Sequence, residues 1–241
     1  TRFTDGPKHS WPLQRGFDDC YGLIQGGANY YHPTTLVRGN DPIEPEGKGY
    51  YLTDAISDEA VRQLREHAIR PGDAPFFQYV AYTAPHWPLH APEEDVTKYR
   101  GRFDAGWDVL RRQRRDRMID MGLLDADCPL SERDPNVAPW VDEPNKEWQA
   151  RRMEVYAAQI DRMDQGIGRI LQTLRDTGMR DNTLIIFLSD NGGCAEGLGT
   201  DGSMWLEKKV ATATTWDGEP VRFGNRPDIV PGSENSFSSY G

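Results

Sequence analysis

The chain is poor in cysteine, in long apolar runs and in positive charge, and each shortage disfavours a class of protein. Its three cysteines lie far apart and are odd in number, so they do not make the disulfide framework of a small secreted domain. No apolar stretch approaches the ~20 residues of a membrane-spanning helix. The net charge of −10 disfavours nucleic acid as a partner. An anionic substrate would therefore have to be attracted by local cations.

The most informative feature is an apolar run that ends in an oxygen-rich turn. Residues 184–188 (LIIFL) predict a buried strand, and residues 189–193 (SDNGG) follow it directly. Ligands bind at the carboxyl ends of strands in open α/β sheets. The carboxylate of Asp190 and the amide oxygen of Asn191 are suitable ligands for a hard cation. The alternative is a strand followed by an Asx-type turn without a ligand.

A second predicted strand leads into a rigid loop with two histidines. Residues 75–82 predict the strand, and the loop over 83–92 contains Pro85, Pro88 and Pro92. Each proline fixes its own φ and restricts the residue before it. Histidine titrates near neutral pH, so His86 and His90 are candidates for acid/base chemistry in this frame. The alternative is that they are surface or capping residues.

The rest of the pattern favours one α/β domain. Apolar residues at helical spacing predict helices over 53–68 and 147–178. The first helix leads into the strand at 75–82, as in one half of a parallel α/β unit. Residues 95–123 predict a helix rich in arginine. Because aspartates intersperse the arginines, we interpret this helix as a solvated face and not as a nucleic-acid site.

Four stretches of the chain resemble the motifs of one family. They are residues 12–18 (PLQRGFD), 83–92 (TAPHWPLHAP), 156–164 (YAAQIDRMD) and 189–193 (SDNGG). Their order and spacing are similar to those of the sulfatases of the alkaline-phosphatase-like superfamily, over most of residues 11–196. The resemblance implies an incomplete α/β fold of alkaline-phosphatase-like type, with a mixed, mostly parallel sheet flanked by helices.

The resemblance also implies roles for particular residues. His86 would lie beside the sulfate and donate a proton to the leaving alcohol. Asp190 and Asn191 would be two of the ligands of a divalent cation, most often calcium in bacterial members. His90 has no assigned role and is expected to be part of the loop structure. The implied activity is that of an arylsulfatase-like sulfuric ester hydrolase. Its substrate would be a small-molecule or glycan sulfate ester, and the sequence does not indicate an oligomeric state.

Several family elements have no counterpart in the sequence. The formylglycine nucleophile is made from Cys or Ser in C/S-x-P/A-x-R, and no such motif occurs. The N-terminal Asp-Asp metal pair and the late lysine before E-G-G are also absent. We therefore expect residues 1–241 to be a partial catalytic domain that lacks the N-terminal nucleophile segment and the C-terminal part. Alone it should bind metal weakly and be inactive. By family analogy the protein would be periplasmic or secreted.

Two other functions are compatible with the same motifs. The first is a phosphodiesterase or phosphonate hydrolase of the same superfamily, because the metal turn and the histidine are shared. The missing nucleophile would distinguish them, since formylglycine favours sulfatase and an unmodified Ser or Thr favours phosphoryl transfer. The second is a catalytically inactive remnant.

Overall fold

The computed structural model describes residues 6–24, 28–193, 199 and 214–239. Within these ranges the α-helices are α1 (Leu52–Ala68), α2 (Glu93–Thr97), α3 (Gly106–Asp120) and α4 (Lys146–Asp176). Short 3-10 turns occur at η2 (Pro12–Arg15), η3 (Trp140–Asp142) and η4 (Arg180–Asn182). The helices predicted over 53–68 and 147–178 are confirmed as α1 and α4. None of the helices in the described ranges combines the length and apolar character needed to cross a membrane.

The strands are short and form two small sheets in the described part of the chain. An antiparallel sheet has the order β1 (Tyr21–Leu23), β2 (Leu36–Arg38) and β3 (Asp41–Pro42), with Gly22 opposite Val37. A parallel pair joins β4 (Arg222–Phe223) to β5 (Ser236–Phe237). The fold is therefore mixed α/β, as predicted.

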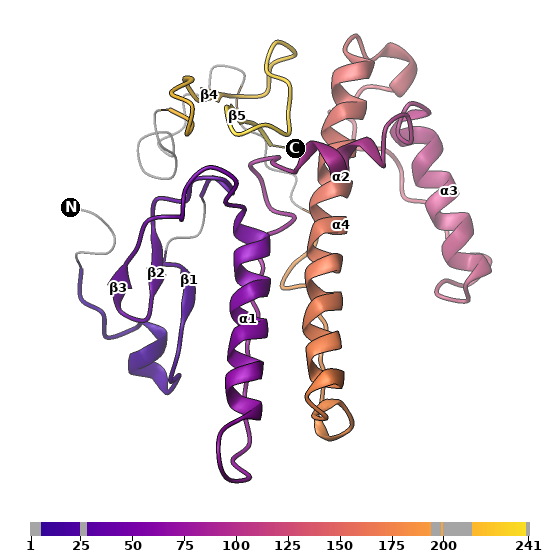
Figure 1. The fold of residues 1–241 in the computed structure, drawn as a ribbon. Helices are drawn as coiled ribbons and strands as arrows, with labels where there is room; N and C mark the ends of the chain where they lie inside the picture. Colours follow the sequence, from indigo (N-terminus) through magenta and orange to yellow (C-terminus); the bar gives the residue numbers. More distant parts are fainter. Residues whose placement is uncertain (1–5, 25–27, 194–198, 200–213, 240–241) are drawn as a thin grey trace.

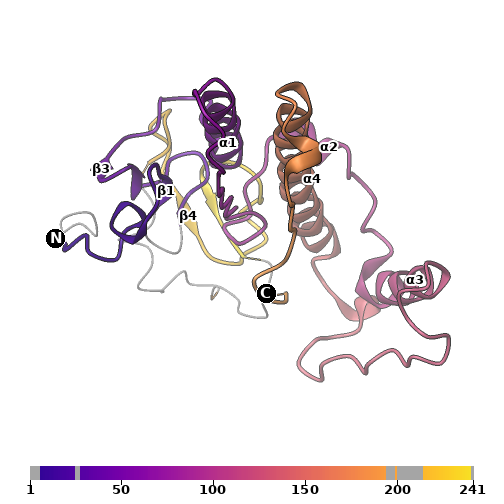
Figure 2. The same cartoon turned by 90° about the horizontal axis from the view of Figure 1, so that it is seen from below.

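Two helices form the centre of the structure. Helices α1 and α4 run side by side, and the β1–β3 sheet lies on the side of α1 away from α4 (Figure 1). The α3 arm, with its long loop back to α4, stands apart from this centre (Figure 2). The base of the arm is held by Trp107, which packs edge-on against Trp140 and donates its indole N–H to the Ala138 carbonyl at 3.1 Å.

A glycine allows α1 and α4 to approach closely. A Cβ placed on Gly166 of α4 would lie 2.1 Å from the Ser57 hydroxyl oxygen of α1, far inside van der Waals contact. The Ser57 hydroxyl in turn bonds the Thr53 carbonyl and the Tyr82 hydroxyl, both at 2.8 Å. Gly166 therefore lets α4 pack directly against α1.

Among the described residues, the apolar core has two clusters that share the loop over 83–92. The first surrounds the start of α1 and consists of Tyr30, Leu36, Tyr51, Leu52 and Ala84. The second joins the loop to α2 and α4 and consists of Leu89, Ala91, Val96, Val155 and Ala158. Because the loop contributes to both clusters, burial of apolar surface holds it at both ends.

The prediction of a strand at 75–82 is wrong, because this segment pairs with none of the described strands. Its side chains nevertheless alternate as they do in a strand. Even-numbered side chains face α1: Phe76, Gln78 and Tyr82 contact His67, Ala60 and Ser57, respectively. Phe77 and Tyr79 are 79% and 72% exposed. This alternation is that of an extended chain, but none of the described strands pairs with it.

The prediction of a buried strand at 184–188 is also wrong. These five residues are between 39% and 86% exposed, and none of the described strands pairs with them. An apolar run predicts burial only if other elements cover it, and a strand of a parallel sheet is covered on both faces and bonded on both edges. The described residues do not provide those neighbours.

Candidate active site

The two histidines of the loop over 83–92 lie in opposite environments. The loop connects the extended segment at 75–82 to α2. His86 is exposed, whereas His90 is completely buried. Only His86 is therefore accessible to a substrate from solvent.

The ring of His86 is oriented by its neighbour. Its Nδ1 lies 2.7 Å from the Trp87 carbonyl oxygen, and the two rings pack with centroids 5.0 Å apart. A carbonyl only accepts hydrogen bonds, so Nδ1 carries the hydrogen in this contact. This bond is compatible with both the neutral and the charged ring. Nε2 is therefore the ring nitrogen that this bond leaves available to a ligand.

The main-chain carbonyl of His86 accepts from two buried side chains. The Tyr30 hydroxyl donates to it at 2.8 Å and the Gln159 Nε2 at 3.3 Å. Gln159 Nε2 is also 3.3 Å from the Pro88 carbonyl. Tyr30 precedes β2 and Gln159 lies in α4, so elements from distant parts of the sequence converge on this carbonyl.

His90 is a structural residue, as expected. The Tyr30 backbone N–H donates to Nδ1 at 3.3 Å, so Nε2 carries the hydrogen and donates to the Ser236 carbonyl at 2.5 Å. A proton on Nδ1 would oppose the Tyr30 N–H. Complete burial disfavours the charged ring and lowers the pKa of His90 to about 4.

Main-chain hydrogen bonds attach the second half of the loop to the C-terminal segment, residues 232–238. The Leu89 N–H donates to the Ser238 carbonyl at 2.9 Å, and the Ala91 N–H donates to the Gly232 carbonyl at 3.2 Å. The Tyr51 hydroxyl donates to the His90 carbonyl at 2.8 Å. These bonds fix the loop where it enters α2.

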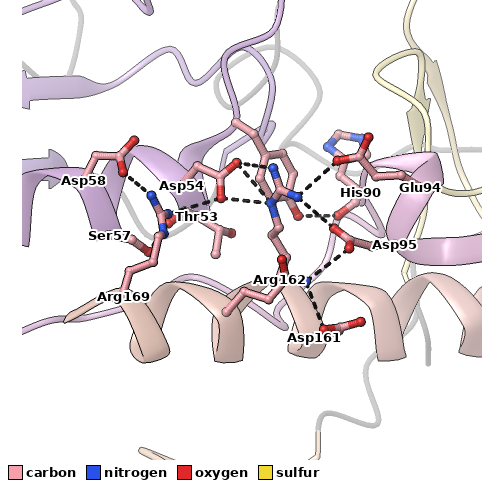
Figure 3. Close-up of polar contacts among 12 residues, drawn as sticks. Thr53, Asp54, Ser57, Asp58, His90, Glu94, Asp95, Asp161, Arg162 and Arg169 are labelled. Atoms are coloured by element: carbon pink, nitrogen blue, oxygen red, sulfur yellow. Dashed lines mark hydrogen bonds and ion pairs between the residues drawn. The ribbon is translucent and has the colours of Figure 1, made fainter. Parts of the chain in front are cut away.

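A cluster of ion pairs connects α1, α2 and α4 next to the loop. Figure 3 shows Arg162 of α4 between Asp54 of α1 and Asp95 of α2, with nitrogen–oxygen distances of 2.7 Å and 3.3 Å. Asp95 is buried and also accepts from Lys98 at 2.6 Å. Lys98 reaches Asp161 of α4 at 3.1 Å, which gives Asp161 a structural role. The cluster holds α2, and with it the end of the loop.

Comparison with known proteins identifies the family. A family model described as Sulfatase matches residues 2–219. The chain belongs to the sulfatase family.

Two curated sulfatases are similar over nearly the whole chain. An uncharacterised sulfatase of Schizosaccharomyces pombe is 34% identical over 249 residues, which cover 96% of this chain and 42% of the relative. An arylsulfatase of Klebsiella aerogenes is 32% identical over 248 residues, which cover 95% of this chain and 48% of the relative. The chain thus spans about half the length of these relatives. A crystal structure of Ps i-CgsB in complex with k-i-k-neocarrahexaose is 24% identical, covers 74% of this chain and 33% of that chain, and has a TM-score of 0.46.

The residues proposed for the sulfatase metal site lie in the exposed segment 189–193. Asp190 and Asn191 are both exposed, and the Ser189 hydroxyl donates to the Asn191 carbonyl at 2.7 Å. Their oxygens suit calcium, which takes roughly six to eight oxygen ligands. In the described part of the chain, however, no group of three or more His, Cys, Asp or Glu side chains could hold a metal. These residues alone do not make a calcium site, and their role as ligands stays a prediction.

Sequence reasoning missed Tyr30 and Gln159. Gln159 had a signal, because it is a polar residue on the face of α4 that also presents Val155 and Met163 at helical spacing. A buried amide on an apolar face needs hydrogen-bond partners, and its partners are loop carbonyls. Tyr30 had no comparable signal, because its role depends on a hydroxyl that meets a carbonyl 56 positions away in the sequence.

Proposed function

We propose that the chain is part of the catalytic domain of a sulfatase that hydrolyses a sulfate monoester, with His86 as the proton donor to the leaving alcohol. The sulfatase match over residues 2–219 carries this proposal. The 42% and 48% coverage of the relatives supports a partial domain. The exposed apolar run at 184–188 gives independent support, because contiguous exposed apolar surface is normally covered by another element.

His86 has the accessibility and the orientation that proton donation requires. With Nδ1 bonded to the Trp87 carbonyl, Nε2 of the charged ring is the donor available to a bound ester. When the S–O bond breaks, its electron pair stays on the departing oxygen and the Nε2 proton moves to that oxygen. The sulfuryl group would pass to the nucleophile, and overall one water is consumed to give the alcohol and inorganic sulfate. By family resemblance, that nucleophile is a formylglycine outside this chain.

The proposal also includes a cation, although the proton transfer from His86 does not depend on it. A divalent cation, most often calcium in bacterial members of the family, would withdraw charge from the sulfate oxygens. Asp190 and Asn191 would supply two of its ligands, and the other ligands would come from outside this chain.

The substrate and the location are proposed at a coarse level. The name of the Klebsiella aerogenes relative indicates aryl sulfates for that protein, and we extend to this chain only the class of sulfate monoesters, on small molecules or glycans. By family analogy we also propose export to the periplasm or the medium.

The test is to express the chain with the coding sequence that flanks it, in a host that forms formylglycine. Hydrolysis of para-nitrophenyl sulfate is expected, with much slower hydrolysis of bis-para-nitrophenyl phosphate, and the 241-residue chain alone should be inactive. A preference for the phosphodiester would indicate a phosphodiesterase of the same superfamily. An absence of turnover on either ester, in protein that is folded and carries formylglycine, would indicate an inactive remnant.

A further inference from the structure

Tyr30 connects the two histidines of the loop. Its backbone N–H donates to His90 Nδ1 at 3.3 Å, and its hydroxyl donates to the His86 carbonyl at 2.8 Å. Its own carbonyl accepts from the Leu52 N–H, at the start of α1, at 2.8 Å. Tyr30 is 1% exposed and stacks on Tyr51 with ring centroids 5.7 Å apart. Its hydroxyl is therefore a donor with a fixed position.

Gln159 holds the main-chain carbonyls of the two residues that flank Trp87 in the sequence. Its Nε2 lies 3.3 Å from the carbonyls of both His86 and Pro88. Two carbonyl acceptors require a nitrogen at this position, which decides which end of the amide faces the loop. The amide is completely buried, and its Oε1 has no hydrogen-bond partner among the residues that the structure describes. A buried acceptor without a partner opposes stability, so this arrangement calls for another explanation.

The position of the Trp87 carbonyl decides the orientation and the tautomer of the His86 ring. The Trp87 carbonyl accepts from His86 Nδ1, which keeps the hydrogen of the neutral ring on Nδ1 and leaves Nε2 as the reactive atom. The Trp87 carbonyl lies between the two carbonyls that Gln159 holds, and Tyr30 holds the first of those as well. A loop released from these donors would let the ring rotate and exchange tautomers.

We propose that Tyr30 and Gln159 are positioning residues that, through the His86 carbonyl, fix the ring orientation and the tautomer of His86, which rests on the proposed role of His86 as proton donor. Each acts on the backbone that carries the ring and its Trp87 acceptor.

The test is nitrogen-15 NMR of the imidazole rings in the 241-residue chain, at a pH where His86 is neutral. The chain itself should show His86 with its hydrogen on Nδ1 and His90 with its hydrogen on Nε2. Tyr30→Phe and Gln159→Met should each move the His86 signals towards the tautomer mixture of a solvated imidazole. The His90 signals, which should keep the Nε2–H form, report in the same spectrum that the loop is folded.

Tyr51→Phe is the matched control. It also removes a hydroxyl that donates to a carbonyl of the same loop, but that carbonyl belongs to His90. The His86 tautomer should stay as in the parent chain. Equal shifts in all three variants would mean that the loop is merely loosened, and would overturn the proposal. If the His86 signals are unchanged in Tyr30→Phe or in Gln159→Met, the substituted residue has no positioning role.

The kinetic consequence separates this inference from the proposed function. In the longer, active protein, both variants should lower kcat on a sulfate ester about tenfold with little change in KM, because they act on the proton donor and not on substrate binding. If the longer protein hydrolyses no sulfate ester, the proposed function fails while the NMR result still decides the positioning role. If it is active and both variants keep the parent kcat, the positioning role fails.

Discussion

Gln159 of α4 donates to the main-chain carbonyl of His86, 73 positions earlier in the sequence, at 3.3 Å. Three positions further along α4, Arg162 binds Asp95 at the start of α2. One helix therefore holds the loop over 83–92 near His86 and at its far end. Because α4 also packs closely on α1, changes at that helix–helix contact should affect the stability of the whole site.

The contact between α1 and α4 predicts opposite effects for two neighbouring glycines. Gly166→Ala places a methyl group 2.1 Å from the Ser57 hydroxyl oxygen, and overpacking of this kind costs roughly 1–3 kcal/mol. Gly168 faces open space in the same helix, so Gly168→Ala should stabilise by about 0.5–1 kcal/mol through helix propensity. Urea unfolding of the two variants measures the difference. A Gly166→Ala variant as stable as Gly168→Ala would show that the helices do not meet this closely.

Burial of His90 predicts a loss of stability in mild acid. Its pKa is lowered from 6.5 to about 4 in the folded chain, so between these values the unfolded state binds a proton that the folded state does not. The free energy of unfolding should therefore fall as the pH falls through this window, by about 3 kcal/mol in total. His90→Gln keeps a donor for the Ser236 carbonyl and removes the titration. Urea unfolding between pH 7 and 4.5 should give a flatter profile for this variant, and parallel profiles would contradict the assignment.

The ion-pair cluster predicts unequal effects for two arginines of α4. Arg162→Met removes one cationic partner from the buried Asp95, which keeps Lys98, and one from the partly buried Asp54, which keeps Arg169 at 3.6 Å. The loss of these charged hydrogen bonds should cost about 2 kcal/mol. Arg169 is 46% exposed and pairs mainly with Asp58, which is 63% exposed, so Arg169→Met should cost less than ~1 kcal/mol. Thermal unfolding of the two variants compares them directly. Equal losses would mean that Asp95 does not depend on Arg162.

Chelation should leave the isolated chain unchanged. Asp190 and Asn191 are exposed, and the described residues add no further cluster of ligands, so calcium binding should be weak. Millimolar EDTA, or millimolar calcium, should not shift Tm, because only a ligand that binds the folded state tightly stabilises it. Asp190→Ala is the control and should respond in the same way. A large drop in Tm with EDTA, absent from Asp190→Ala, would reveal a complete metal site in this chain.

The helices and the histidine loop could be predicted because their signals are local. Apolar residues at helical spacing predict α1 and α4 directly, and the prolines around His86 predict a rigid loop. The strands at 75–82 and 184–188 could not be judged this way, because a strand also needs partners from elsewhere. The supports of His86 were missed for the same reason, since Tyr30 and Gln159 act over long separations in sequence. The different burial of His86 and His90 depends on how the C-terminal segment packs on the loop.

The most direct measurement is the dependence of the His86→Ala defect on the leaving group, in the protein expressed with its flanking coding sequence. A proton donor matters most for a strongly basic leaving oxygen. We expect kcat to fall roughly 100-fold or more on phenyl or alkyl sulfates and much less on para-nitrophenyl sulfate. Equal losses on all these esters, or no loss on any of them, would contradict the role of His86 as the proton donor.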